Sequence, residues 1–167
     1  MRNRILALTV ASLALAAASC GGGECIPLDP GGETPKFIGA YEGVQTATVE
    51  NCLGMQICEG PTTVGIFLDE QGQFVVGKTD CNGNYYELDG GQVCEPTSPG
   101  RYQVIGTHNV TEATADPKVT YTIALQLDET GDKPIISGTL TMSVIPSSGQ
   151  ACVLSGSITG TCVDCVP

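Results

Sequence analysis

Three runs in the C-terminal half of the chain alternate apolar and polar residues with a period of two. Every second residue from Val119 to Leu127 is apolar in VTYTIALQLDE (119–129), and most residues between them are polar. The same alternation recurs in IISGTLTMSVI (135–145) and CVLSGSITGTC (152–162). Successive side chains of a strand point to opposite faces, so this pattern predicts strands with one buried face. No window after the first twenty residues shows a helical stripe, which predicts an all-β domain.

From Phe37 onward the pattern predicts a series of strands separated by turn-forming residues. Turns are expected at DEQG (69–72) and DETGDKP (128–134). Eight sequential antiparallel strands fit an up-and-down barrel, and a two-sheet β-sandwich is the alternative. Glycines inside the strand runs favour the barrel, because a small barrel needs sharply curved strands. The expected strands are 38–50, 62–69, 73–79, 84–89, 101–110, 119–128, 135–145 and 151–161.

The first expected strand opens with FIGAYEGV (37–44). This stretch resembles the Gly-x-Trp start of the lipocalins, with Tyr41 in the tryptophan position. The resemblance covers one motif, in a chain that contains no tryptophan. It implies a barrel and a carrier of small apolar ligands.

The first twenty residues have the features of an export signal. Arg2 and Arg4 precede an apolar stretch of fourteen residues, 5–18 (18 − 5 + 1). A helix of that length measures roughly 21 Å, which is shorter than the roughly 30 Å hydrocarbon core of a bilayer. The stretch therefore predicts a secretion signal and not a membrane span.

Small residues, 16–19, lead directly to Cys20. This arrangement resembles the lipobox of bacterial lipoproteins, although Ala17 stands where that motif usually has leucine. The resemblance implies cleavage before Cys20, acylation of Cys20, and a lipid anchor in the bacterial cell envelope. We expect the outer membrane, on its periplasmic or surface face; ordinary cleavage and free secretion is the alternative. The expected organisation is a signal peptide at 1–19, a flexible Gly/Pro-rich tether at 20–36 and one β-domain at 37–167.

The cysteine count agrees with this assignment. The chain has nine cysteines, an odd number for an exported protein. With Cys20 set aside as the lipid carrier, an even set remains that can form four disulfides. The expected disulfide cysteines are Cys25, Cys52, Cys58, Cys81, Cys94, Cys152, Cys162 and Cys165.

The order of the strands places these cysteines at two ends of the domain. Each strand of a meander runs opposite to the one before it, so successive connections lie at alternate ends. With eight strands, one end of the domain holds Cys52, Cys58, Cys81 and Cys152. The other end holds Cys25, Cys94, Cys162 and Cys165. This division reduces the roughly 105 possible connectivities of eight cysteines to about nine. A pairing of Cys152 with a member of its own group supports the eight-strand meander.

The charge of the chain argues against a nucleic-acid partner. Without Arg2 and Arg4, five basic and 18 acidic residues remain, which gives a net charge of about −13 (5 − 18). Phosphate binding needs clustered Lys and Arg. The same charge disfavours electrostatic binding to anionic lipid, so the expected membrane contact is the lipid anchor alone.

No arrangement of residues predicts catalysis, a metal or a cofactor. His108 is the one histidine, and its alternation with Val104 places it on the core face. Cys162 and Cys165 have the Cys-x-x-Cys spacing, but they follow a strand, whereas redox pairs of this kind lie at a helix N-terminus. They are therefore interpreted as a structural disulfide.

The stretch DCNGNYYELDGG (80–91) begins like a calcium loop, with oxygen-bearing residues at alternate positions. Such a loop needs glycine at its sixth position and glutamate at its twelfth. Tyr85 and Gly91 occupy those positions. Turn geometry explains the Asp80 region better than calcium binding does.

The expected function is that of a lipid-anchored envelope lipoprotein with a non-catalytic structural or protein-binding role. The alternative is a lipocalin-like carrier of a small apolar ligand. A closed apolar cavity of several hundred Å³ would favour the carrier. A filled interior would favour the structural role.

Overall fold

The computed structural model describes residues 25–31, 34–47, 52–112 and 114–165. These residues form an all-β structure, and none of their segments is a helix long and apolar enough to cross a membrane. The strands are β1 (Gly39–Ala47), β2 (Gly60–Leu68), β3 (Phe74–Thr79), β4 (Tyr85–Glu87), β5 (Asp89–Val93), β6 (Arg101–Asn109), β7 (Lys118–Asp128), β8 (Ile135–Ile145) and β9 (Cys152–Cys162).

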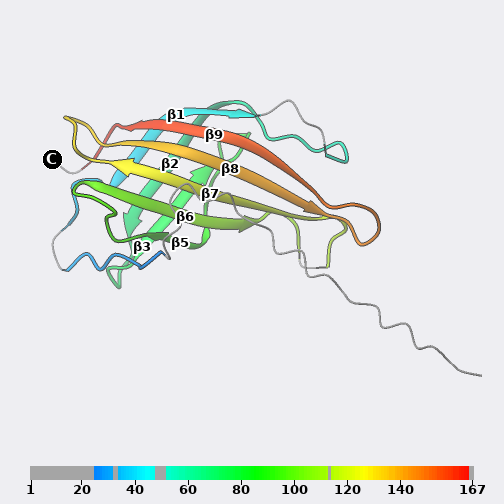
Figure 1. Ribbon diagram of the computed structural model, residues 1–167, viewed down its shortest axis with the longest axis horizontal. Coiled ribbons are helices and arrows are strands. Elements are labelled where there is room, and N and C mark those ends of the chain that lie inside the picture. The colour runs from blue at the N-terminus through cyan, green and yellow to red at the C-terminus, as the bar shows by residue number, and fades with distance from the viewer. Residues whose placement is uncertain (1–24, 32–33, 48–51, 113, 166–167) are drawn as a thin grey trace, which may run out of the picture.

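The strands follow one another as an antiparallel meander whose first and last members meet. The order in the sheet is β4-β3-β2-β1-β9-β8-β7-β6-β5, with β1 paired to both β2 and β9. In Figure 1, β6 to β9 run along the long axis, and β2 and β3 cross behind them at a steep angle. The result is a nearly closed barrel, which confirms the predicted architecture.

One position of the meander is shared by two short strands. β4 pairs with β3, whereas β5, which begins directly after Leu88, pairs with β6. The Leu88 amide still donates to the carbonyl of Val76 on β3 at 2.8 Å. The chain then leaves β3 through Gly90, whose φ of 60° is favoured by glycine, and the β5–β6 register shifts there.

The prediction of a single strand at 84–89 is therefore wrong, since two short strands, β4 and β5, lie there instead. The sequence pattern does not show where the chain changes from one partner strand to another. β4 and β5 run in the same direction, so together they occupy one place in the meander. The ends of the barrel consequently alternate as they would with eight strands. The other predicted strands are present with slightly shifted ends, and positions 48–50 of the first lie outside the described residues.

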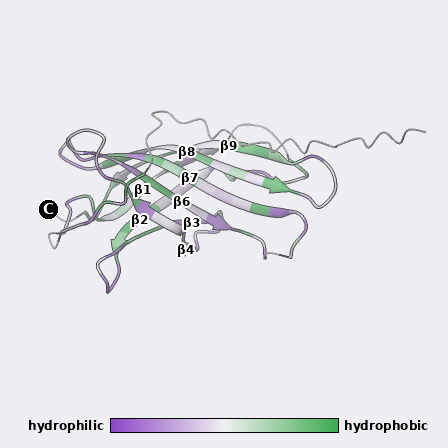
Figure 2. Ribbon diagram, turned by 60° about the horizontal axis from the view of Figure 1, so that its bottom comes forward, coloured by the Kyte–Doolittle hydropathy of each residue, from purple (hydrophilic) through white to green (hydrophobic). Residues whose placement is uncertain are grey.

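The two ends of the barrel differ in what fills them. At the end where β1 begins, which we name the Phe37 end, the ring of Phe37 packs against Phe74 and Tyr102 with centroids 5.9 and 4.7 Å away. Tyr41 is fully buried beneath them and donates its hydroxyl hydrogen to the carbonyl of Phe37 at 2.6 Å. Figure 2 shows apolar segments within the strands, whereas many of the connecting loops are hydrophilic. Aliphatic side chains fill the middle of the barrel, among them Val64, Val104, Ile123, Leu125, Leu140 and Ile158.

The opposite end, which we name the Lys78 end, is polar inside. Among the described residues, the buried polar side chains are Gln45, Thr62 and Lys78, with exposed fractions of 3%, 6% and 3%. Each continues the inward-facing series of its strand toward this end. The barrel interior therefore changes from aromatic and aliphatic to polar along its axis.

Four disulfides join all eight cysteines of the described residues, which confirms a disulfide-linked β-domain. The pairs follow the division predicted from the order of the strands. Cys25–Cys94 and Cys162–Cys165 lie at the Phe37 end, and Cys52–Cys152 and Cys58–Cys81 lie at the Lys78 end.

Part of the predicted tether packs against the barrel. Leu28 donates its amide hydrogen to the carbonyl of Val93 at 2.8 Å, and Glu95 donates to Ile26 at 2.7 Å. Together with the Cys25–Cys94 disulfide, these bonds attach the start of the described chain beside β5.

Candidate functional site

A cavity of about 250 Å³ opens at the Lys78 end. The Cys58–Cys81 disulfide contributes to its lining and joins the segment before β2 to the segment after β3. Other residues that line it come from β1, β3, β4, β6 and β7, among them Gln45, Lys78, Tyr86, His108 and Tyr121, and from the 80–84 turn, which contributes Asp80 and Asn84.

Lys78 reaches the cavity because it continues the inward face of β3. Phe74, Val76 and Lys78 alternate along this strand, and the first two contribute to the core. The ammonium group donates to the carbonyl of Thr79 at 2.5 Å and lies 3.4 Å from the hydroxyl of Tyr86. It also lies 5.4 Å from the centroid of the Tyr86 ring, a cation–π contact.

This cation has no carboxylate partner in the part of the chain that the structure describes, where the ion pair found is Arg101–Asp128. Burial lowers the pKa of Lys78 to about 8, and the nearby charge of Asp80 opposes that shift. The ammonium form still predominates at neutral pH. Lys78 therefore supplies a buried positive charge, and its hydrogen bonds to Thr79 and Tyr86 use two of its three N–H bonds.

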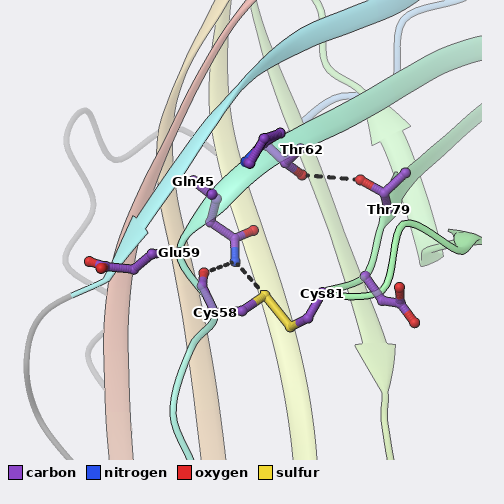
Figure 3. A pocket seen from close by; sticks show the side chains of 9 residues that line it. Gln45, Cys58, Glu59, Thr62, Thr79 and Cys81 are labelled. Carbon is purple, nitrogen blue, oxygen red and sulfur yellow. Dashed lines mark hydrogen bonds between the residues drawn. A yellow bond between two sulfur atoms is a disulfide. The ribbon is translucent and has the colours of Figure 1, made fainter.

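Gln45 is held in one orientation by the chain beside the disulfide. Its amide nitrogen donates to the carbonyl of Cys58 at 2.7 Å, and Figure 3 shows the amide oxygen pointing away from that contact. A rotated amide would place two carbonyl oxygens against each other, so the assignment is chemically required. The oxygen of Gln45 is buried and has no partner among the described residues.

An aromatic group forms another part of the wall. The rings of Tyr86 on β4 and His108 on β6 lie with centroids 4.2 Å apart, at an angle of 33°. Tyr121 of β7 also lines the cavity. Burial raises the pKa of both Tyr86 and Tyr121, so each hydroxyl keeps its hydrogen at neutral pH. The wall therefore offers flat apolar surface together with hydroxyl groups.

A smaller cavity of about 70 Å³ lies beside the first and shares Gln45, Cys58 and Cys81 with it. Figure 3 shows its wall, where the hydroxyls of Thr62 and Thr79 are 3.5 Å apart. This cavity has room for only two or three waters at about 30 Å³ each. The larger cavity is therefore the candidate ligand site.

The carboxylate of Asp80 accepts hydrogen bonds within its own turn. One carboxylate oxygen accepts the backbone amides of Asn82 and Asn84, each at 2.8 Å, and the other accepts the Asn84 side chain at 3.1 Å. Hydrogen bonds from Asn84, and then from Asn82, hold the pKa of Asp80 below its usual range. This geometry agrees with the turn interpretation of the stretch at 80–91.

The residues singled out in the sequence have different locations. Cys20 lies outside the described residues, so its lipidation stays a prediction. His108 points inward, as expected, and contributes to the cavity wall. Cys162 and Cys165 are bonded to each other at the far end of the barrel.

Lys78 and Gln45 belong to no motif in the sequence, although the alternation of residues contains a signal for both. Lys78 is in phase with Val76, and Gln45 is in phase with Tyr41. A long polar side chain at an inward position near a strand end predicts a polar opening of the barrel.

Comparison with protein-family models, with curated proteins and with solved structures finds no match for this chain. The candidate site therefore rests on its own geometry.

Proposed function

We propose that this protein is an exported, lipid-anchored envelope protein whose barrel binds a small polar ligand at the Lys78 end. Export is supported by the basic and apolar signal of residues 1–19 and by four disulfides, which persist in oxidising compartments. Anchoring is supported by Cys20, the one cysteine that these disulfides leave over.

A binding role is carried by one observation: the cavity is lined by two buried polar side chains, Lys78, which has no carboxylate partner, and Gln45, whose amide oxygen has no hydrogen-bond partner among the described residues. A buried acceptor without a partner costs about 1–3 kcal/mol. A purely structural barrel would gain stability by replacing such groups with apolar side chains. A ligand that satisfies both groups would recover this cost on binding.

The same geometry argues against a lipocalin-like carrier of an apolar ligand. The Phe37 end is filled by aromatic side chains. The cavity of about 250 Å³ lies below the roughly 300–1,000 Å³ of typical ligand pockets. Its lining includes a cation. A small, polar ligand fits these constraints better than a fatty one.

Membrane fractionation tests the anchor. Replacing Cys20→Ala removes the acylated group, and a lipid chain provides about 0.8 kcal/mol of membrane affinity per buried CH₂. We expect the Cys20→Ala protein in the soluble fraction, with its four disulfides intact. Ser19→Ala is the matched control and should stay with the membranes. A Cys20→Ala protein that still sediments with membranes would show that the anchor is elsewhere.

A further inference from the structure

We infer that the ligand of the Lys78 end is a small organic carboxylate that also carries a hydrogen-bond donor and a flat apolar body. The carboxylate binds the ammonium group of Lys78, and the donor binds the amide oxygen of Gln45. This inference rests on the proposed binding function and specifies its ligand.

The negative charge of the ligand follows from the surroundings of Lys78. Its side chain is 3% exposed, and its two hydrogen-bond acceptors are the neutral oxygens of Thr79 and Tyr86. Asp80 also lines the cavity, but its carboxylate oxygens accept hydrogen bonds within the 80–84 turn and none from Lys78. A buried cation needs a compensating anion or further hydrogen bonds. A carboxylate in the cavity supplies both, through a charge-assisted bond.

The donor on the ligand follows from Gln45. Gln45 lines the cavity, its nitrogen is engaged by Cys58, and the atom left without a partner is an acceptor. Only an N–H or O–H group can satisfy that atom. An inorganic anion such as sulfate carries no such hydrogen at neutral pH, so it would satisfy Lys78 and leave Gln45 unpaired.

The size and the flat shape of the ligand follow from the volume of the cavity and from its aromatic wall. About 250 Å³ accommodates roughly eight waters at about 30 Å³ each, and therefore an organic molecule of similar size. The rings of Tyr86, His108 and Tyr121 line this space and offer flat surfaces for stacking. A hydroxylated aromatic acid combines the three required features.

Calorimetric titration of the full chain tests this inference with four matched probes. The 3- and 4-hydroxybenzoates carry the anion and a donor in two spacings, benzoate lacks the donor, and 4-hydroxybenzamide lacks the charge. We expect one hydroxybenzoate to bind most tightly. Benzoate and the amide should each bind about tenfold more weakly, as the loss of one hydrogen bond to a charged or buried group predicts.

Variants assign the two contacts. Lys78→Met should weaken the binding of hydroxybenzoate at least about tenfold, while the affinity for 4-hydroxybenzamide stays unchanged. Gln45→Met should lower the affinity for hydroxybenzoate to that for benzoate, and the affinity for benzoate should not change. Lys118→Met is the matched control, because Lys118 is an exposed lysine at the same end, where β7 begins. Circular dichroism and thiol labelling establish that each variant is folded and fully disulfide-bonded.

The outcomes separate this inference from the proposed function. If the amide binds as tightly as the acids, and Lys78→Met has no effect, the cavity binds small molecules but its ligand is not an anion. If Lys118→Met weakens hydroxybenzoate as much as Lys78→Met does, the anion responds to overall charge and the assigned contact is wrong. If no probe binds, water fills the cavity and the binding function fails together with this inference.

Discussion

Gly43 of β1 lies directly opposite Gly160 of β9, where the first and last strands of the barrel meet. A Cβ atom on Gly43 would lie 1.7 Å from the carbonyl oxygen of Thr159 and 2.5 Å from the Cα of Gly160. Both neighbours are backbone atoms, so no side-chain rotation relieves the overlap. The closure of the barrel depends on this absence of a side chain.

Replacing Gly43→Ala should therefore lower the free energy of unfolding by about 3 kcal/mol or more, because the two strands must separate to admit the methyl group. Urea denaturation followed by circular dichroism measures the change. Gly131→Ala is the control, since a Cβ atom there meets nothing closer than 3.7 Å. Equal effects of the two substitutions would show that the β1–β9 contact is not tightly packed.

The disulfides should differ in their contribution to stability. Cys52–Cys152 spans a sequence separation of 100 residues, whereas Cys162–Cys165 spans three. Loop-closure entropy predicts about 5 kcal/mol for the first and about 1 to 2 kcal/mol for the second. Paired replacement by alanine, with unfolding measured in guanidinium chloride, tests this order. A larger loss from the short loop would contradict the entropic argument.

The contribution of Lys78 to the stability of the protein should rise between about pH 8 and pH 10. Its pKa falls from 10.5 to about 8 on folding, so the unfolded chain binds more protons in this range. Stability increases with pH wherever the unfolded state binds more protons. The expected contribution of Lys78 is roughly 2 kcal/mol between neutral pH and pH 10. Near pH 10 the tyrosines oppose it, because burial raises their pKa values in the folded protein and they ionise first in the unfolded chain.

Lys78→Met should abolish this rise and should be the more stable protein at pH 7, because no charge is then buried. Tyr86, Tyr121, His108 and Asp80 remain in or beside the cavity in both proteins, so the difference between the two curves isolates the lysine. Chemical denaturation at a series of pH values provides the curves. Parallel curves for the two proteins would mean that Lys78 is solvated in the folded state.

Most of the strands could be predicted because one face of each is buried. The alternation at 119–128 and 135–145 leaves a single way to place the apolar residues inward, and β7 and β8 follow it almost residue for residue. The alternation does not say whether the sheet closes on itself. That choice depends on the β1–β9 pairing, which joins residues more than a hundred positions apart, such as Tyr41 and Cys162.

The division between β4 and β5 and the details of the cavity depend on tertiary contacts. The stretch from Tyr85 to Val93 has no local pattern that shows a change of partner at Leu88. The phase of Lys78 with Val76 could have revealed an inward cation. The orientation of the Gln45 amide could not be predicted, because it is determined by the Cys58 carbonyl, whose position depends on a disulfide.

The place where the chain enters the barrel also determines how a lipid on Cys20 would orient the cavity. The Cys25–Cys94 disulfide attaches that entry to the Phe37 end. Cys25 follows Cys20 by five positions (25 − 20), which span at most about 18 Å. The longest strands have 11 residues and measure about 36 Å. With Cys20 acylated, the Phe37 end would stand next to the bilayer and the cavity would open on the side away from it, where a water-soluble ligand arrives without passing the lipid headgroups.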